Sequence, residues 1–375
     1  MARSKPPQSY KRGPQNLEAR IVSAIASAGP RNVARISRMT GTHQETIRYK
    51  VKKRFGRLGL RFHAEVDFAK LGLAMHWGEL EFSEAYRDKA QRILRTLNRV
   101  GYLTYFGKVV PQGNFVILVT LPQHARPGYG EFLTELCEKG ILTSFSLNEV
   151  LVERYKQVDP HFFNFRSGRW EIEWNRIDKE PASPLVPLTK IPIEDFDRYD
   201  LLIIKELQRD PLQHLTEVAR ILKVQQKTLE YHYRAHVNAR RLIPSYNVRW
   251  AQDIRKSSVH SVVIIQIIFH RLTKFELAEV QPMVSKIPLL WVEDLLQNGT
   301  YVAAFHVPLT DIVELSSYVS SAVQHVASKV ELDFIDPSES AVFTLPYNLY
   351  QEKEWKFSLR QLESAVQSSL STSLQ

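Results

Sequence analysis

The chain has 375 residues, with 50 Lys and Arg against 40 Asp and Glu, and a formal net charge of +10. At about 100–200 residues per domain this length predicts two to four domains, and a hydrophobic share of 44% is typical of a globular protein. The sequence contains no apolar run of about 20 residues, which excludes a transmembrane helix. The single cysteine, Cys137, excludes internal disulfides and Cys-based metal clusters. We therefore expect a cytoplasmic protein that does not enter a membrane.

The positive charge is concentrated in two segments. Residues 1–61 hold 15 bases and two acids, a net charge of +13, and residues 197–250 have a net charge of +4. The segments that follow them, 62–196 and 251–375, have net charges of −2 and −5. Clustered basicity is the electrostatic signature of a protein that binds a polyanion. This distribution predicts nucleic acid as the partner.

The first half begins with a basic arm, residues 1–15, followed by a predicted winged helix-turn-helix domain over residues 16–70. Its three short helices have apolar residues at helical spacing, as in Ile47, Val51 and Phe55 of the third helix. Alternating apolar residues then predict a strand from Phe62 to Phe68. Residues 71–165 have a β-α-β-β-α-β pattern, which is typical of a ferredoxin-like domain.

The second half repeats this order after a Pro-rich linker at residues 166–196. A second winged helix-turn-helix is predicted over 197–252, a second ferredoxin-like domain over 253–350, and a C-terminal tail over 351–375. A shift of 182 residues, without gaps from about residue 17 to 66, places Thr46–Tyr49 on Thr228–Tyr231. The chain is thus predicted to be a tandem duplication of the α+β class, with two helical and two ferredoxin-like effector-type domains.

The third helix of each helical domain has the pattern of a recognition helix. Such a helix enters the major groove of double-stranded DNA with its N-terminal residues near base edges, while Lys and Arg neutralise phosphates. The predicted DNA-binding residues of the first copy are Thr42, His43, Gln44, Arg48, Tyr49, Lys52, Lys53 and Arg57. Those of the second copy are Gln225, Gln226, Lys227, Tyr231 and Arg234. Because the second copy has less positive charge, we expect the first to dominate DNA affinity.

The sequence resembles a tandem duplication of the feast/famine (Lrp/AsnC-type) transcription regulators. The best local match is Asp197–Asp210, which is similar to the opening helix of that family. Thr46-Ile47 followed by Lys50-Val51 resembles its recognition helix. One departure occurs in both copies: the family has Leu eight residues after this Thr, whereas here Arg54 and His236 occupy that position, followed by Phe55 and Val237. The resemblance implies a sequence-specific transcriptional regulator that is not an enzyme.

Further expectations follow from this resemblance. Family members bind an amino-acid effector near a Gly-x-Asp-Tyr signature, and the equivalent residues here are Gly113-Asn114 and Gly299-Thr300, without the acidic residue. Binding of a small-molecule effector at these residues is therefore left open. The alternative is that each Gly only forms a tight turn between two strands. Family members pair two effector domains, which implies an internal pseudo-dimer here, with further homo-oligomers left open. No cofactor and no metal are expected.

Two alternative functions were weighed against regulation. One is a tetrapyrrole (sirohaem) decarboxylase-like enzyme, because such enzymes have the same architecture and rely on His and Arg in the effector-type domain. The candidate histidines His76, His124, His161, His306 and His325 form no paired motif in the sequence. The other alternative is a non-specific DNA-organising protein. The strong basicity of the first helical segment favours DNA binding over the enzyme.

Overall fold

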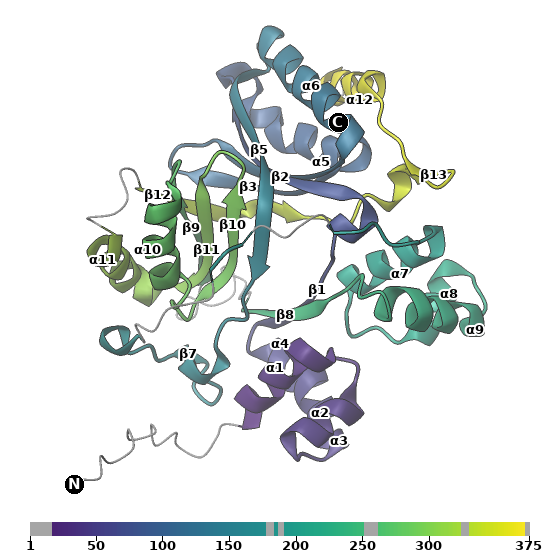
Figure 1. Ribbon diagram of the computed structural model, residues 1–375, viewed down its shortest axis with the longest axis vertical. Coiled ribbons are helices and arrows are strands. Elements are labelled where there is room, and N and C mark those ends of the chain that lie inside the picture. Colours follow the sequence, from purple (N-terminus) through teal and green to yellow (C-terminus); the bar gives the residue numbers. More distant parts are fainter. Residues whose placement is uncertain (1–16, 178–183, 187–190, 251–261, 324–329, 372–375) are drawn as a thin grey trace.

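The computed structural model describes residues 17–177, 184–186, 191–250, 262–323 and 330–371. The expected basic arm, parts of the expected linker and His325 lie outside these ranges. The described chain forms one central barrel with helices around it and two three-helix modules at one end (Figure 1). This is a mixed α/β fold. Among the described residues, no helix is both long enough and apolar enough to cross a bilayer.

The two three-helix modules have the same element order. The first contains α1 (Leu17–Ala28), α2 (Val33–Thr40), α3 (Gln44–Tyr49), the π-helical segment η1 (Lys50–Arg54), α4 (Phe55–Arg57) and β1 (Leu60–Glu65). The second contains α7 (Arg198–Arg209), α8 (Leu215–Leu222), α9 (Gln226–Tyr231), the π-helical segment η7 (His232–Asn238) and β8 (Ser245–Trp250).

The π-helical segments explain why both copies depart from the family pattern in the same way. A π-turn accommodates one additional residue within a helix. In the first module this turn delivers Phe55, rather than Arg54, to the core, where Phe55 has no exposed surface. In the second module Val237 is buried to 1% exposure in the same way. The one-residue shift is therefore an insertion in the third helix that leaves the packing of the module intact.

The strands of the two ferredoxin-like segments close into a single eight-stranded barrel, in the order β10-β11-β9-β12-β3-β4-β2-β5. The strands of the first half are β2 (Leu73–Phe82), β3 (Leu103–Val110), β4 (Phe115–Pro122) and β5 (Leu142–Tyr155). Those of the second half are β9 (Val262–Phe269), β10 (Leu290–Leu296), β11 (Tyr301–Pro308) and β12 (Val330–Val342). The closing pairs, β5 with β10 and β12 with β3, each join one half to the other.

This barrel corrects the expectation of two separate ferredoxin-like domains, because the strands of both halves form one closed sheet. The strand ending each half is long, since β5 has 14 residues and β12 has 13. Each therefore extends beyond its own sheet and pairs with an edge strand of the other half. Apolar side chains fill the middle of the barrel, including Trp77, Val116 and Ile268. Closure removes the exposed sheet edges that two separate sheets would leave.

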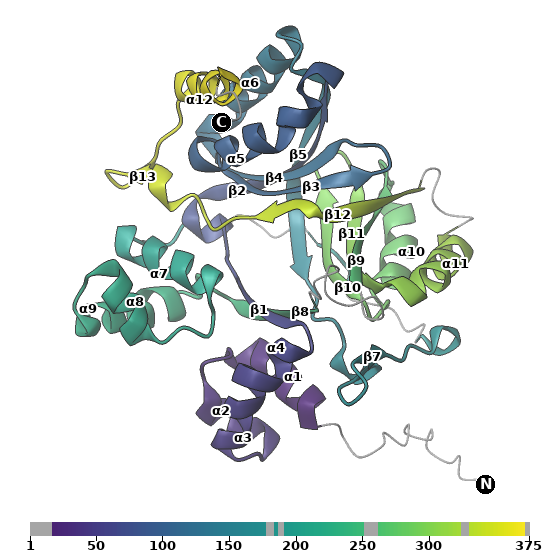
Figure 2. The same ribbon diagram turned by 180° about the vertical axis from the view of Figure 1, so that it is seen from behind.

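Helices cover the outside of the barrel in two groups, one on each half (Figures 1 and 2). The first half is covered by α5 (Ala90–Val100) and α6 (Arg126–Glu138), which α12 (Leu359–Ser371) contacts. The second half is covered by α10 (Lys274–Val284) and α11 (Ile312–Val323). The C-terminal segment, expected to be a tail, thus contributes a packed helix in which Leu362 and Val366 are buried.

The strand that follows each three-helix module does not form a wing within its own module. Instead β1 and β8 pair with each other as an antiparallel ribbon, with Leu60 opposite Trp250 and Glu65 opposite Ser245. Two core clusters then join each module to the opposite half. Ile47 and Phe55 share a core with Trp250 and Phe305, whereas Leu207 and Leu229 share one with Ala64 and Phe106. The ribbon lies between the modules and one end of the barrel (Figure 1).

Candidate active site

The ribbon has one apolar and one polar face. Strand alternation places Leu60, Phe62, Val248 and Trp250 on the face that joins a hydrophobic core. The other face contains His63 and Glu65 from β1 and Asn247 and Arg249 from β8, with His63 directly opposite Asn247. Glu65 and Asn247 are buried, and the Arg249 side chain is only 13% exposed. Polar residues with so little exposure must find partners in the barrel end that the ribbon covers.

The barrel end supplies an aromatic and imidazole platform for Arg249. Trp291 is the extra residue of a β-bulge in β10, where the register with β11 shifts between Leu290 and Val292. Bulges re-aim side chains and are frequent near active sites. The Arg249 guanidinium lies 4.3 Å from the Trp291 ring centroid, and the His306 ring lies 5.3 Å from it. The bulge thereby brings Arg249 and His306 to one indole.

Carboxyl groups surround this platform. Glu65 Oε1 accepts a hydrogen bond from Arg249 at 3.5 Å, and Glu153 of β5 lies opposite Asp294 of β10. Burial raises the pKa of Glu65 although Arg249 lowers it in part. Burial and the neighbouring Asp294 raise the pKa of Glu153 well above its ordinary value. Burial, together with Glu293, raises the pKa of Asp294 to about 8. Asp294 therefore holds a proton at neutral pH.

We call this set of side chains the barrel-mouth cluster: His63, Glu65, Glu153, Tyr155, Asn247, Arg249, Trp291, Asp294 and His306. Both histidines are neutral, because burial and the charge of Arg249 lower the pKa of His306 to about 3 and that of His63 well below its ordinary value. The cluster thus combines a fixed cation, neutral imidazoles and a protonated carboxyl group. Such a set can bind a carboxylate and supply a proton beside it.

Several buried polar atoms of the cluster have no hydrogen-bond partner among the described residues. They are Arg249 Nε, Trp291 Nε1, His306 Nδ1, Asp294 Oδ1 and Asn247 Nδ2. Buried polar groups are usually paired, because an unpaired one costs about 1–3 kcal/mol. Five such atoms in one place indicate a site built for polar groups of a ligand, and the part-exposed Tyr155 and Trp291 provide its open edge.

Two surface pockets lie elsewhere. A cleft of about 820 Å³ along α5 is rich in Arg, including Arg92, Arg95 and Arg99, but its described lining has no histidine. A smaller pocket of about 340 Å³ contains Asn114, one of the predicted effector residues, beside Glu79 and Glu81. Gly113 and Gly299 have φ of +85° and +82°, as tight turns require. Thr300 Oγ1 accepts a hydrogen bond from the Arg271 amide. These four residues do not join the barrel-mouth cluster.

The predicted DNA-binding residues lie on the third helices of the two modules. His43 caps α3, and Arg48 forms an ion pair with Glu45. Exposed side chains in the first module are those of His43, Arg48, Tyr49, Lys52, Lys53 and Arg57, while Thr42 and Gln44 are half-buried. In the second module Gln225, Gln226, Lys227, Tyr231 and Arg234 are all exposed. Their role in binding DNA stays a prediction.

Sequence reasoning missed most of the barrel-mouth cluster. His306 was among the candidate histidines, but Arg249 had been assigned to a wing strand. The two are distant in the chain and belong to different elements, so no spacing links them. The available signal was the pattern of β8, in which Asn247 and Arg249 alternate with Val248 and Trp250 and so predict a polar face. The partner of that face could not be inferred without the barrel.

One further group has the spacing of metal ligands. Asp197, Asp200, His232 and His236 in the second module offer ligand atoms within 4.8 Å of one another. This group was not recognised in the sequence, where no metal was expected.

No protein-family model matches the sequence, and no curated protein matches it. Among solved structures, the chain is similar to the siroheme decarboxylase NirDL, with a TM-score of 0.56 and 11% identity, covering 94% of this chain and 99% of that one. The same enzyme in complex with an iron-uroporphyrin III analogue gives a TM-score of 0.55, 11% identity and coverage of 95% and 100%. A transcriptional regulatory protein of the AsnC family from Pyrococcus furiosus matches 37% of this chain and 89% of its own, with a TM-score of 0.29 and 13% identity.

These findings correct the functional expectation from the sequence. A DNA-binding transcriptional regulator that is not an enzyme was expected. The fold of nearly the whole chain is instead shared with an enzyme, the siroheme decarboxylase NirDL. The expectation of a regulator rested on the basic charge of the first module, which was interpreted as the signature of a polyanion partner. The alternative of a tetrapyrrole decarboxylase-like enzyme agrees better with the fold.

Proposed function

We propose that this chain is an enzyme that removes a carboxyl group from a tetrapyrrole, as a sirohaem decarboxylase does. The observation that supports this most strongly is the barrel-mouth cluster, which sets Arg249 and His306 against one indole within a fold shared with such an enzyme over the full chain. Unpaired buried polar atoms mark this place as built for a polar ligand.

In this proposal Arg249 binds the substrate carboxylate. A guanidinium pairs with a carboxylate through parallel hydrogen bonds, and Arg249 Nε is free of partners among the described residues. The Trp291 ring fixes the plane of the guanidinium by a cation–π contact. The neutral His306 lies on the same indole and orients the bound carboxylate by a hydrogen bond from its imidazole.

The reaction needs one proton for each carboxyl group lost. The bond between the carboxylate carbon and its neighbour breaks, CO₂ leaves, and the electron pair stays on the neighbouring carbon, where the tetrapyrrole ring delocalises it. Asp294, with its pKa raised to about 8, is protonated at neutral pH and gives its proton to that carbon. Glu153, beside Asp294 and partly exposed, returns a proton from solvent. No oxidant is consumed.

The three-helix modules acquire a different role in this proposal. We infer that they are winged-helix domains whose strands were diverted from wings to the ribbon. In that arrangement β1 and β8 supply His63, Glu65 and Arg249 to the reaction site. The modules hold the ribbon through the cores that they share with the opposite halves.

The test is binding of sirohaem under anaerobic conditions, followed by its visible absorption spectrum. Wild-type protein should shift the Soret band at one site per chain, and Arg249→Met should weaken binding at least about tenfold because it loses a charged hydrogen bond. Arg99→Met, in the cleft along α5, is the matched control and should bind as wild type does. Equal binding by wild type and Arg249→Met, or lost binding only in Arg99→Met, would refute the assignment.

A further inference from the structure

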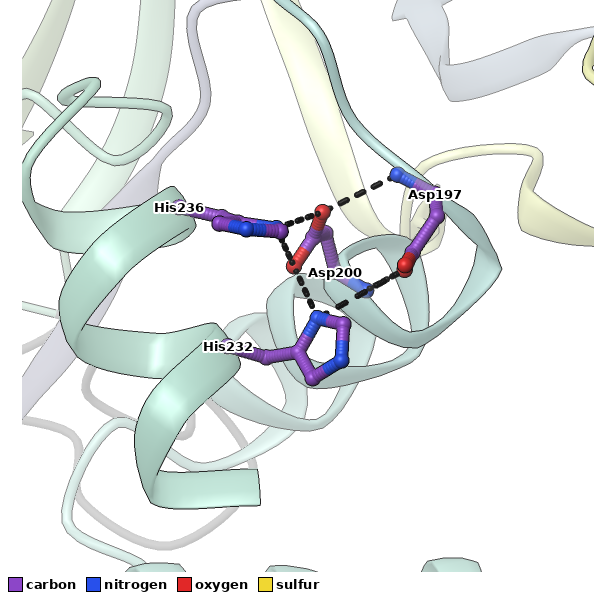
Figure 3. A group of neighbouring side chains, drawn as sticks. All are labelled: Asp197, Asp200, His232 and His236. Carbon is purple, nitrogen blue, oxygen red and sulfur yellow. Dashed lines mark hydrogen bonds and ion pairs between the residues drawn. The ribbon is translucent and has the colours of Figure 1, made fainter. Parts of the chain in front are cut away.

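Four metal-ligating side chains converge where α7 begins, and they come from two helices (Figure 3). Asp197 caps α7 and Asp200 lies in its first turn, while His232 and His236 lie in η7. The Nδ1 atom of His232 is 3.0 Å from Asp200 Oδ1 and 3.7 Å from Asp197 Oδ1. The Nδ1 atom of His236 is 2.9 Å from Asp200 Oδ2. Both imidazoles therefore present Nδ1 to the Asp200 carboxylate, and His232 Nδ1 also faces Asp197.

The ligand atoms lie nearly as close together as those of a tetrahedral metal site. Zinc binds His nitrogen and carboxylate oxygen at about 2.0–2.2 Å, which puts neighbouring ligand atoms about 3.3–3.5 Å apart. The distances here are 2.9–3.7 Å, and all four ligand atoms lie within 4.8 Å. His232 and His236 are four residues apart, which places both rings on one side of η7 with ring centroids 4.9 Å apart.

The first module shows how a carboxylate at the equivalent position is neutralised where the two histidines are absent. The same 182-residue register places Glu18, Lys50 and Arg54 at the positions of Asp200, His232 and His236. There Lys50 forms an ion pair with Glu18, and both Lys50 and Arg54 lower the pKa of that carboxyl group against the effect of burial. A carboxylate at this position is thus neutralised by permanent cations in one copy of the repeat.

The second module has no permanent cation at the equivalent positions. Asp200 is fully buried there and faces two imidazoles with side-chain exposures of 12% and 16%. A buried carboxylate without a compensating positive charge is costly. A divalent cation between the imidazoles and carboxylates would supply the charge that Lys50 and Arg54 supply in the first module.

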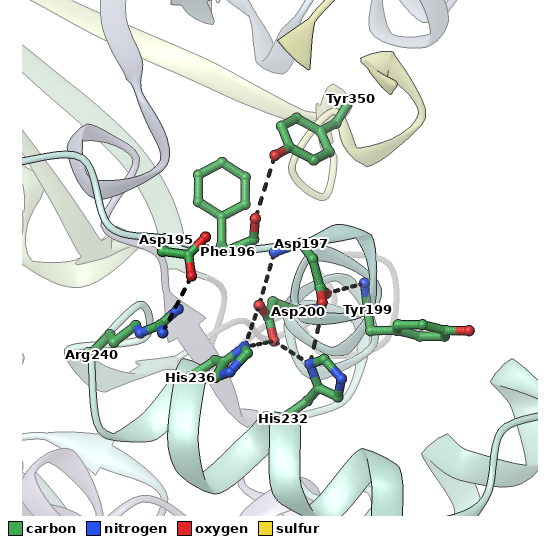
Figure 4. Close-up of polar contacts among 9 residues, drawn as sticks. All are labelled: Asp195, Phe196, Asp197, Tyr199, Asp200, His232, His236, Arg240 and Tyr350. Atoms are coloured by element: carbon green, nitrogen blue, oxygen red, sulfur yellow. Dashed lines mark hydrogen bonds and ion pairs between the residues drawn. The ribbon is translucent and has the colours of Figure 1, made fainter. Parts of the chain in front are cut away.

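Hydrogen bonds already hold both carboxylates in place (Figure 4). Asp197 Oδ1 accepts from the amides of Tyr199 and Asp200 at 2.8 and 3.2 Å, and Asp200 Oδ2 accepts from the Asp197 amide at 2.9 Å. The Tyr231 ring packs edge-on against both imidazoles and shields them from one side. Such outer contacts orient ligands and are typical of metal sites.

We propose that Asp197, Asp200, His232 and His236 form a structural site for a divalent transition-metal ion of the zinc type. Imidazole nitrogen with carboxylate oxygen suits zinc, and four protein ligands are typical of a structural rather than a catalytic site. The ion ties the start of α7 to η7, and so fixes the second module. This inference does not depend on the proposed decarboxylation.

The test uses untagged full-length protein that has been treated with a chelator and then titrated with Zn²⁺ and, separately, with Co²⁺. Wild type should bind one Zn²⁺ per chain by mass spectrometry of the native protein, and Co²⁺ should give the intense visible bands of a tetrahedral complex. His232→Gln with His236→Gln should bind Zn²⁺ at least about a hundredfold more weakly. His161→Gln, which removes an exposed histidine next to Asp159, is the matched control and should bind as wild type does.

A second variant keeps the test decisive if the first fails to fold. The double variant His232→Lys with His236→Arg places the cations of the first module in the second. This variant should unfold at the same temperature with or without Zn²⁺, whereas wild type should gain thermal stability from Zn²⁺. Absence of Zn²⁺ binding by wild type at micromolar concentration would overturn the proposal and leave a plain cluster of His–Asp ion pairs. Undiminished Zn²⁺ binding by the Lys/Arg variant would also overturn it.

Discussion

Replacing Asp294 by Asn should stabilise the folded protein at neutral pH and abolish its proposed reaction. Asp294 is 5% exposed, and burial with the nearby Glu293 raises its pKa from 3.8 to about 8. Below about pH 3 the carboxyl group is mostly protonated in both the folded and the unfolded chain and has little effect on stability. Between the two pKa values only the unfolded chain is ionised, so the stability of wild type falls as the pH rises, and it levels off above about pH 8.

The size of this effect follows from the pKa difference. One unit is worth 1.36 kcal/mol, and at pH 7 about three units separate the pH from the ordinary pKa of Asp. The free energy of unfolding of wild type is therefore lower by up to about 4 kcal/mol at pH 7 than at low pH. Asp294→Asn avoids this loss because Asn has no ionisable group.

Urea unfolding of wild type and Asp294→Asn at pH 4, 6, 7 and 8 measures this difference. We expect nearly equal stability at pH 4 and a growing advantage of Asp294→Asn up to pH 8, together with loss of decarboxylation. Asp88→Asn, at an exposed position, is the control and should stay within about 0.5 kcal/mol of wild type at each pH. A variant less stable than wild type at pH 7, or a difference independent of pH, would refute the reasoning.

Three other substitutions test the site and the fold. Arg249→Lys should lower kcat/KM for the tetrapyrrole about 100-fold with little change in the stability of the fold. Lys retains the positive charge but lacks the planar guanidinium that stacks on Trp291. Activity equal to that of wild type would contradict this prediction. Phe55→Ala should lower the free energy of unfolding in urea by about 3–5 kcal/mol, because this ring is fully buried in the core. A decrease of less than about 1 kcal/mol would contradict that packing. Gly29→Ala should lower the free energy of unfolding by about 1–2 kcal/mol. The backbone φ at Gly29 is +76°, and the new Cβ would lie 2.9 Å from the ring of Tyr246 in the other module. An unchanged unfolding midpoint would argue against this contact.

Local structure followed closely from the sequence. The β-α-β-β-α-β order expected over residues 71–165 is that of β2, α5, β3, β4, α6 and β5. Period-two and period-3.6 patterns report which face of an element is buried, so they predicted these elements well. They do not report which element lies against that face, and for this reason the closed barrel and the ribbon were not foreseen.

The candidate site was harder to predict for the same reason. Arg249 and Glu65 are charged residues in segments that were assigned to winged helix-turn-helix domains, and nothing in their spacing relates them to His306. The metal-ligand group was missed in another way. Asp197 and Asp200 match a helix cap in the sequence, while His232 and His236 face them because η7 packs against α7. Both groups arise from long-range packing that a single sequence does not encode in its periodicity.

The measurement that tests the central claim most directly is anaerobic incubation of the purified chain with sirohaem, with the tetrapyrrole analysed by mass spectrometry over time. The account predicts products lighter by one or more CO₂ units from wild type, and intact sirohaem from Arg249→Met and Asp294→Asn. Intact sirohaem after incubation with folded wild-type protein, or equal conversion by Arg249→Met, would contradict it.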